Sequence, residues 1–451
     1  MIQMVRLGDV AHINPRFDKS SLADDVPVSF VQMASVGAAD GEINVSIVRP
    51  FAEVKKGSYT PFKDGDVLFA KVTPCMENGK MAVARGLKNG VGFGSSEFHV
   101  LRPSDKVDAK YLYHFVSSQA FRKEAAGHMT GAVGLRRVPA AFLADKVIPL
   151  VPMDEQRRIV AEIEQQFSRL GVAVANLQRV KANLKRYKAS VLKAAVEGRL
   201  VETEASIAKR EGRSYETGEQ LLQRVLEERR AKWAGKGKYK EPVIATTTSL
   251  PALPEGWAMA AYWQLGEVVT GFTPPTGDAA NFGGDTPFCK PTDLDAGDSV
   301  RDARKYLSLI GLQKGRKLAA GSVLVTCIGA TIGKTGLALV DCATNQQINS
   351  VKPVVTGVDS RYLFWWTCSP TGQAQIVENA SATTLPILNK SKFEALPVAL
   401  PPFSEQIRIV AEVDRHLSII RELEVEVDIN IQRSQALRQA TLANAFSSTL
   451  V

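Results

Sequence analysis

The sequence predicts an α+β protein with two mixed α/β domains joined by two long helices and related by a pseudo-two-fold internal repeat. The repeat is directly visible, because 14 of the 52 positions in 150–201 are identical, without gaps, to those in 400–451. Each copy has apolar residues at helical spacing and follows a stretch of short apolar runs and turn residues. The chain is therefore predicted to hold two copies of one unit, a variable domain followed by a long helix.

The first variable domain is predicted over residues 1–152. The runs Val67–Val72 and Phe98–Leu101 are apolar and lie between turn residues, which predicts strands. A helix is expected from Tyr111 to Ala126. Asn78-Gly79-Lys80 lies between β-like runs, so a tight turn that presents a lysine is expected there.

Residues 153–200 predict a central long helix, and residues 402–451 predict its repeat. Asp154 and Ser404 are expected to cap the two helices, and Gly198 to end the first. The apolar positions recur at three- and four-residue steps or at whole heptads, the pattern of a coiled coil. They are Val160, Ile163, Phe167, Leu170, Val174, Leu177, Leu184 and Val191, then Val410, Val413, Leu417, Ile420, Val427 and Ile431. The two stripes are expected to bury each other in an antiparallel coiled coil.

A charged linker is predicted over 201–250, with a helix from Thr217 to Trp233 followed by the flexible runs 235–240 and 246–249. The second variable domain is predicted over 251–401, and Leu253-Pro-Glu-Gly-Trp257 opens it. The run Val323–Ile328 predicts one of its strands.

The composition excludes several classes of protein. Hydrophobic residues make up 45% and charged residues 23%, which is typical of globular chains. There is no run of roughly 20 apolar residues and no secretory signal, so a cytoplasmic protein without a membrane segment is expected. The five cysteines show no C-x-x-C spacing, which disfavours a zinc ribbon or a redox motif.

The charge favours a polyanionic partner. Lysine and arginine number 56 against 47 acidic residues, a net charge of +9. The excess lies in the N-terminal half: residues 153–201 carry 10 basic and 5 acidic side chains, whereas 401–451 carry 5 and 7. DNA or RNA is a natural partner for such a chain, although many basic proteins bind neither.

Catalytic motifs are missing from the sequence. Gly329-Ala-Thr-Ile-Gly333-Lys334-Thr335 is similar to a phosphate-binding loop, but that motif needs four residues between its glycines, and the following residues 336–340 resemble a strand. A turn loop is therefore favoured over an ATP-dependent enzyme. The acidic pairs Asp24-Asp25 and the set Asp293, Asp295 and Asp298 could chelate a metal, but loops are commonly acidic. The five histidines are isolated, so structural roles are favoured and a non-catalytic chain is predicted.

Several loop residues are candidates for reading DNA. Asn345-Gln346-Gln347 offers amides that can bond adenine, and Arg136-Arg137 and Lys71 can contact guanine or phosphate. For any single residue, an ordinary structural role explains the sequence at least as well. The candidate DNA-binding residues are Lys71, Thr73, Asn78, Lys80, Arg136, Arg137, Lys290, Thr292, Thr331, Lys334, Asn345, Gln346, Gln347 and Lys390.

The repeated helix opening Pro-x-x-Glu-Gln-x-x-Ile, with the Leu253–Trp257 and Gly329–Lys334 motifs, resembles the specificity subunit of type I restriction-modification systems. The helix motif comprises Pro152, Glu155, Gln156 and Ile159, then Pro402, Glu405, Gln406 and Ile409. The resemblance implies two target recognition domains that each read one half of a split site in double-stranded DNA. It also implies that the coiled coil sets the spacer and docks two methyltransferase subunits.

The same resemblance places the chemistry on partner subunits. This chain would bind no cofactor itself, while S-adenosylmethionine, ATP and Mg would be bound by the methyltransferase and restriction or motor subunits. The sequence departs from the family pattern at its start, where Val5-Arg6-Leu7-Gly8 stands in place of the Leu-Pro-Glu-Gly-Trp motif. A coiled-coil adaptor without sequence-specific DNA binding is the alternative function.

Overall fold

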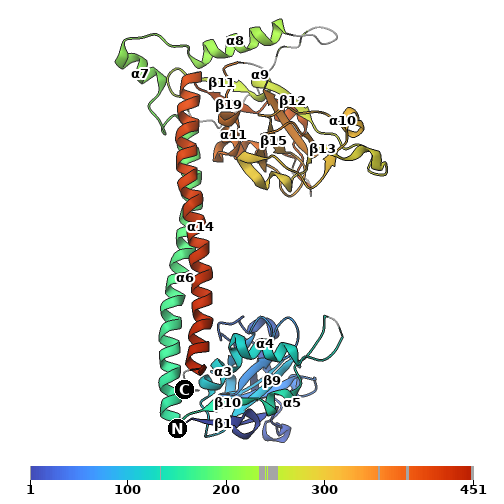
Figure 1. Cartoon of the computed structure of the whole chain (residues 1–451), viewed down its shortest axis with the longest axis vertical. Coiled ribbons are helices and arrows are strands. Elements are labelled where there is room, and N and C mark those ends of the chain that lie inside the picture. Colours follow the sequence, from blue (N-terminus) through green and yellow to red (C-terminus); the bar gives the residue numbers. More distant parts are fainter. Residues whose placement is uncertain are drawn as a thin grey trace. The chain divides into compact units, whose positions relative to one another are not determined.

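The computed structural model describes residues 2–132, 134–232, 239, 241, 252–353, 356–381 and 385–447. The chain divides into two compact units: unit 1 is Met1–Arg179 with Val427–Val451, and unit 2 is Val180–Glu426. Two long helices, α6 (Met153–Val196) and α14 (Phe403–Ser447), each contribute to both units (Figure 1). The predicted α+β fold with two variable domains and two long helices is confirmed.

Unit 1 contains two four-stranded sheets. The strand order of the first is β2-β9-β6-β7, and that of the second is β4-β3-β8-β5. A separate ribbon pairs β1 with β10. The strands are β1 (Gln3–Arg6), β2 (Ala11–Ile13), β3 (Pro27–Val31), β4 (Val48–Pro50), β5 (Thr60–Lys63), β6 (Val67–Ala70), β7 (Met81–Val83), β8 (Val91–Gly94), β9 (Phe98–Pro103) and β10 (Val147–Leu150). The runs predicted as strands correspond to β6 and β9, which pair antiparallel.

The helices of the first domain are α1 (Leu7–Val10), α2 (Phe51–Val54), α3 (Ala109–Ser117), α4 (Gln119–Gly127) and α5 (Ala140–Asp145). The prediction of one helix over 111–126 was wrong, because Ser118 is extended and separates α3 from α4. The Ser118 hydroxyl accepts a hydrogen bond from the Phe121 amide and so caps α4. Tyr111 and Phe121 pack in one core with Leu442 and Phe446 of α14.

Unit 2 has a four-stranded sheet of order β12-β18-β15-β16 and a three-stranded sheet of order β14-β13-β17. Its strands are β11 (Ala258–Ala261), β12 (Gly266–Thr270), β13 (Phe282–Cys289), β14 (Tyr306–Leu307), β15 (Val323–Thr326), β16 (Thr335–Leu337), β17 (Ala343–Thr344), β18 (Ile348–Pro353) and β19 (Pro397–Leu400). Its domain helices are α9 (Tyr262–Leu265), α10 (Leu309–Lys314), α11 (Ser360–Cys368), α12 (Pro370–Glu378) and α13 (Lys390–Glu394). The predicted strand at Val323 is β15.

The two long helices pair antiparallel, as predicted. In unit 1 the Thr441 hydroxyl bonds Gln166 at 3.0 Å, and in unit 2 Tyr187 bonds His416 at 3.0 Å. The stripe is buried at Val160, Ile163, Leu184 and Val191, with Val413, Leu417, Ile420 and Val427 buried on α14. Phe167, Leu170, Val174 and Leu177 in the middle of the first stripe are only partly buried.

The predicted helix caps need correction, whereas the predicted stop is confirmed. The helices begin at Met153 and Phe403, so Asp154 and Ser404 are the second helical residues. The carbonyls of the preceding prolines, Pro152 and Pro402, accept the first backbone bonds. Asp154 therefore acts from within the first turn, where a negative charge is favourable. Gly198 has a φ of +66° just beyond the end of α6, which suits a glycine.

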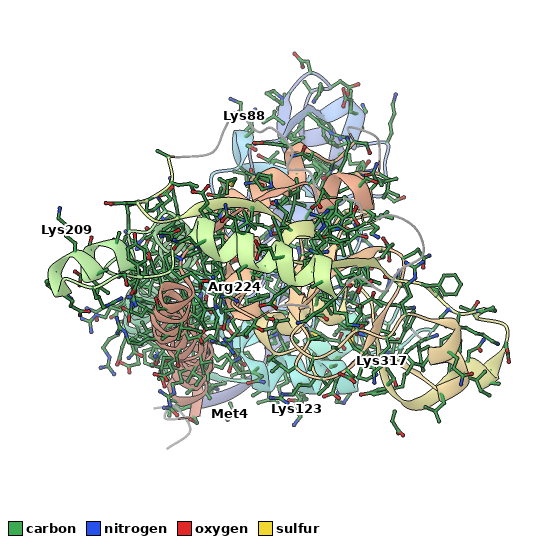
Figure 2. The ribbon with its side chains drawn as sticks, turned by 90° about the horizontal axis from the view of Figure 1, so that it is seen from above. Met4, Lys88, Lys123, Lys209, Arg224 and Lys317 are labelled. Carbon is green, nitrogen blue, oxygen red and sulfur yellow. The ribbon has the colours of Figure 1, made fainter. Side chains whose placement is uncertain are left out.

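The linker forms α7 (Glu204–Glu211) and α8 (Gly218–Ala231). Thr217 and Gln220 form a capping box, as expected for the predicted helix start. Leu221 and Val225 of α8 are buried in the core of unit 2. In the view from above, Lys209 of α7 and Arg224 of α8 mark these helices (Figure 2). Trp233 and the predicted flexible runs, apart from Tyr239, lie outside the described residues.

Candidate nucleic-acid interface

Two loops that are distant in sequence lie side by side in unit 1. Thr130 and Arg137 close a hairpin through paired backbone bonds of 3.0 and 2.8 Å. The Thr73 amide donates to the Arg136 carbonyl at 3.0 Å, and the Val138 amide donates to the Lys71 carbonyl at 2.9 Å. The structure therefore brings together four of the predicted DNA-binding residues, two from each loop.

The two arginines of the hairpin differ in their surroundings. The Arg137 guanidinium makes two bonds to the Glu97 carboxylate, at 2.9 and 2.7 Å, and this lowers the pKa of Glu97. Arg136 is exposed, and its nearest acidic atom in unit 1 is an oxygen of Glu77 at 3.9 Å. Arg136 is therefore the arginine better placed to reach a phosphate or a base, while Arg137 holds the hairpin.

A buried histidine fixes the base of this hairpin. His99 Nε2 lies 2.8 Å from the Val138 carbonyl, and its Nδ1 lies 2.9 Å from the Asn14 amide nitrogen. Burial lowers the pKa of His99, so the ring is neutral, donating from Nε2 and accepting at Nδ1. The base of the hairpin is thus held by side-chain as well as backbone bonds.

The turn at Asn78-Gly79-Lys80 is present, but it does not present the lysine as predicted. Gly79 has a φ of +71°, and Asn78 is exposed. The Lys80 ammonium group instead donates to the carbonyls of Met33 and Val36 at 3.1 and 3.0 Å. Two of the three N–H groups of the Lys80 ammonium are used in this way, so in this structure Lys80 holds the turn.

The three candidate amide residues of unit 2, Asn345 to Gln347, lie between strands β17 and β18. The Asn345 amide donates to the Cys289 carbonyl at 3.3 Å, and the Cys327 amide donates to the Gln347 carbonyl at 2.7 Å. Asn345 is buried and bonds the Gln347 side chain at 2.8 Å, whereas Gln346 is exposed and accepts from Thr273 at 2.6 Å. Gln346 is therefore the most accessible of the three amides.

The Gly329–Thr335 loop is a turn and not the start of a helix. It leads directly into strand β16, so no helix N-terminus faces a phosphate there. Lys334 pairs with Asp295 at 2.6 Å, while Thr331 is exposed. The phosphate-binding interpretation is therefore wrong, and the turn-loop interpretation is the one that the structure supports.

The remaining candidates of unit 2 lie on two other segments. Lys290 is partly buried, and its backbone amide bonds the Asp293 carboxylate at 2.8 Å. Thr292 is exposed just before η5 (Asp293–Ser299). Lys390 is exposed at the start of α13 and pairs with Glu394 at 3.1 Å.

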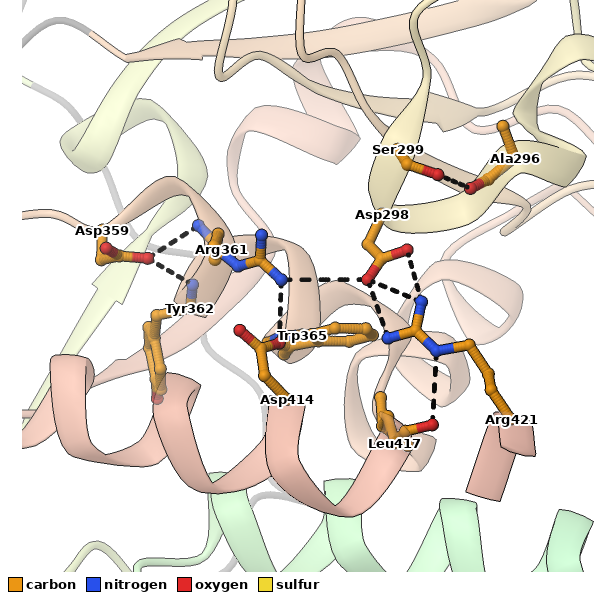
Figure 3. A network of polar contacts seen from close by, with 10 residues as sticks. All are labelled: Ala296, Asp298, Ser299, Asp359, Arg361, Tyr362, Trp365, Asp414, Leu417 and Arg421. Carbon is orange, nitrogen blue, oxygen red and sulfur yellow. Dashed lines mark hydrogen bonds and ion pairs between the residues drawn. The ribbon is translucent and has the colours of Figure 1, made fainter. Parts of the chain in front are cut away.

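Of the acidic residues considered for a metal, Asp24, Asp295 and Asp298 pair with cations, while Asp293 accepts from the backbone amides of Lys290 and Arg304. Asp298 of η5 contacts Arg361 at 3.8 Å and Arg421 at 3.3 Å (Figure 3). Asp295 forms its ion pair with Lys334. In the part of the chain that the structure describes, no group of three metal-ligating side chains is found.

The domain of unit 2 is fastened to α14 through this network. Arg361 of α11 bridges Asp298 and Asp414, and the Trp365 indole donates to the same Asp414 oxygen at 3.2 Å (Figure 3). In unit 1 the equivalent ion pair joins Lys110 of α3 to Glu164 of α6. Each variable domain is thus tied by charge to the long helix that follows it.

The glutamine of the repeated helix motif makes the same three bonds in both units. Gln156 accepts from the Asp108 amide at 2.8 Å and donates to the carbonyls of Lys106 and Val151 at 2.9 and 2.8 Å. Gln406 accepts from the Asp359 amide at 2.9 Å and donates to Gly357 and Pro401 at 3.2 and 3.0 Å. Both side chains are fully buried. We call this arrangement the glutamine clamp, since it fixes the first turn of each long helix to the domain before it.

The glutamates and isoleucines of the motif show less symmetry. Glu155 pairs with its neighbour Arg158 at 2.5 Å, whereas Glu405 is buried and accepts from the Glu204 amide and the Trp257 indole at 2.8 and 3.0 Å. Burial raises the pKa of Glu405. Ile409 is buried, and Ile159 packs partly buried against the core of unit 1. Glu405 of α14 therefore holds both Glu204 of the linker and Trp257 at the start of the second domain.

Two diverged domains clamped in the same way to paired helices define a duplicated recognition protein with basic, amide-rich loops. The chain belongs to the family described as "Type I restriction modification DNA specificity domain", whose profile matches residues 2–179 and 254–432. The match covers each variable domain and part of the helix that follows it.

The relatives include three named specificity subunits. The Escherichia coli EcoAI specificity subunit is 30% identical over 312 residues, which cover 59% of this chain and 51% of that protein. The chain thus spans about half the length of that relative. The Escherichia coli EcoEI subunit is 25% identical over 93% of this chain and 78% of its own length. The Haemophilus influenzae HindI subunit is 25% identical over 88% of both.

Solved structures share the fold. A chain from a study of assembly and conformational transition of the type I R-M system has a TM-score of 0.70 at 21% identity, covering 99% of this chain and 97% of that one. The HsdS subunit from Thermoanaerobacter tengcongensis has a TM-score of 0.52 at 19% identity, covering 99% and 96%. Across the described residues, we find no helix with the length and apolarity needed to span a bilayer.

The sequence analysis did not single out one pair of exposed apolar residues beside the candidate residues. The tip of the hairpin in unit 1 carries an exposed leucine, Leu135, and the corresponding loop of unit 2 carries Leu385. The two leucines are 250 residues apart, the same offset as the helix repeat. That shared spacing is a signal in the sequence by which the two positions could have been found.

Proposed function

We propose that this chain is the DNA sequence-specificity subunit of a type I restriction-modification complex. Each variable domain reads one half of a bipartite target, and the paired helices set the spacer and dock two methyltransferase subunits. The observation that carries the proposal is the glutamine clamp: its three bonds are the same in both units, while the loops at the candidate interface differ. A common frame with different loops suits a protein that reads two different sequences.

The chemistry in this proposal belongs to partner subunits. The methyltransferase subunits bind S-adenosylmethionine and flip an adenine out of the duplex, and restriction or motor subunits use ATP and Mg. The chain itself supplies recognition in the cytoplasm and no catalytic group. Base readout at the two half-sites multiplies the specificity. Because phosphate contacts supply much of the affinity, binding should weaken steeply as the salt concentration rises.

The first test is to express the chain with its neighbouring methyltransferase gene in a host without modification and to map methylated adenines by single-molecule sequencing. A bipartite motif with a constant gap is the expected result. If the complex is assembled but no new methylation appears, the adaptor function is favoured instead.

A second measurement assigns one half-site to unit 1. Arg136→Gln should weaken binding of that half-site and reduce the slope of log affinity against log salt by about one if the arginine contacts a phosphate. Arg169→Gln is the control, because this arginine is exposed on α6 and lies outside the loop cluster. An equal effect of both substitutions would mean that only general charge is sensed.

A further inference from the structure

Each unit presents a leucine to solvent on a loop beside its candidate readers. The Leu135 side chain is 53% exposed, and that of Leu385 is 51% exposed. Leu135 lies on the hairpin closed by Thr130 and Arg137. Leu385 lies on the loop where the Ser381 amide bonds the Ile387 carbonyl at 2.9 Å. The two leucines are 250 residues apart, which is the offset of the repeat.

The same backbone bonds hold both loops. In unit 1 the amides of Thr73 and Val138 bond the carbonyls of Arg136 and Lys71 at 3.0 and 2.9 Å. In unit 2 the corresponding bonds join the amides of Gly329 and Leu388 to the carbonyls of Pro386 and Cys327, at 3.0 and 2.8 Å. The neighbouring side chains have diverged, since Arg136-Arg137 corresponds to Pro386-Ile387. The leucine is therefore kept where the residues around it are not.

The leucines lie next to groups suited to nucleic acid. In unit 1 the residue after Leu135 is the exposed Arg136, and Lys71 is bonded to the base of the same hairpin. In unit 2 a Cβ placed on Gly329 would lie 3.8 Å from Gln347 Nε2 and 3.9 Å from Leu385 Cδ1, so these two side chains flank one glycine. An apolar tip beside cations and amides matches the surface of a base, which has polar edges and apolar faces.

We propose that Leu135 and Leu385 insert into the DNA, each in its own half-site, and make apolar contact with a base. This rests on the proposed function. The contact is either with the methyl group of a thymine or with the face of a partly unstacked base, because both offer the apolar surface that a leucine needs. The anchored base of the hairpin, including the bond from His99 to Val138, keeps the tip in place as it enters the groove.

The test uses the full chain assembled with its methyltransferase partner and a duplex carrying the mapped target. Leu135→Ala and Leu385→Ala are compared with Leu309→Ala, which changes a leucine that is 79% exposed on α10. Because all three side chains are largely exposed, the variants should fold alike, which thermal unfolding checks. Each tip variant should bind the target about tenfold more weakly, and the control should bind like the wild type.

Half-site substitution separates the two tips and the two kinds of contact. Mutating the half-site read by unit 1 should abolish the effect of Leu135→Ala and leave that of Leu385→Ala intact. Replacing a thymine by deoxyuridine should mimic the leucine loss if the methyl group is the contact. If the contact is with an unstacked base, 2-aminopurine placed at that base should become more fluorescent when the wild-type complex binds, and this rise should be absent with the leucine-to-alanine variant.

The outcomes also distinguish this inference from the proposed function. If the wild-type complex reads a bipartite target and both tip variants bind it as tightly as the wild type, the insertion is refuted while the specificity role stands. Equal losses for Leu309→Ala and the tip variants would likewise refute it. If the wild-type complex shows no sequence-dependent binding, the proposed function fails, and the insertion fails with it.

Discussion

The glutamine clamp predicts a local and measurable loss of stability when its side chain is made apolar. We expect Gln156→Met to keep the shape of the side chain but to remove one acceptor and two donors. The Asp108 amide and the carbonyls of Lys106 and Val151 would then lose their partner in a site where Gln156 itself is fully buried. Asp108 also caps α3, so the start of that helix should loosen first.

The expected magnitude follows from the three bonds. A buried polar group that loses its partner costs about 1–3 kcal/mol, and partial access of water reduces this for groups near the surface. Three such groups at about 1 kcal/mol each lower the free energy of unfolding by about 3 kcal/mol in Gln156→Met. Gln406→Met should lower the free energy of unfolding by about the same amount, since the three bonds of Gln406 are of similar length.

Hydrogen exchange read by mass spectrometry suits this prediction, because it resolves α3 from α11 in a chain whose units need not unfold together. Gln156→Met should speed exchange in α3, and Gln406→Met should speed it in α11. Gln165→Met is the matched control, since Gln165 is exposed on the same helix α6. The reasoning is refuted if Gln156→Met lowers the free energy of unfolding by less than about 0.5 kcal/mol. It is also refuted if this variant changes hydrogen exchange in α3 no more than Gln165→Met does.

Two further predictions concern buried side chains. Trp257→Phe should lower the free energy of unfolding of unit 2 by about 2 kcal/mol more than Trp366→Phe, because only the former breaks a bond to a carboxylate, that of Glu405. Within the described residues Trp366 Nε1 has no partner, so equal losses in urea unfolding would contradict this. Burial lowers the pKa of His114 to about 4, from about 6.5 when unfolded. The unfolded chain therefore binds more protons between these values, and stability falls by about 3 kcal/mol as the pH drops from 6.5 to 4. His114→Phe should remove that part of the fall, and an unchanged pH profile would count against it.

Features with a period were predictable from the sequence. The duplication and the heptad stripes rest on spacing, which local geometry translates directly into structure. The strands at Val67 and Val323 were predictable from short apolar runs bounded by turn residues. The cap positions were not predictable, because an acidic residue is favourable both before a helix and within its first turn, and Asp154 fits either place.

The roles of individual site residues were harder to predict. Lys80 looks like a presented cation until Met33 and Val36, far along the chain, supply the carbonyls that bind it. Gln156 was recognised as part of a motif, but its function depends on the Lys106 and Asp108 backbone, which only the folded chain brings near. Contacts between distant segments decide such roles, and composition does not encode them.

The division of the chain between its units also bears on how the protein is made. Unit 2 is one continuous stretch, so all of its residues are synthesised before α14 is complete. Unit 1 includes Leu442 and Phe446, and the Phe446 ring lies 5.2 Å from that of Tyr111. The first domain to be synthesised is thus the last to be finished, and its unpaired apolar surface must avoid aggregation until some 300 later residues have followed Tyr111. Truncated products of translation should be the species most dependent on chaperones.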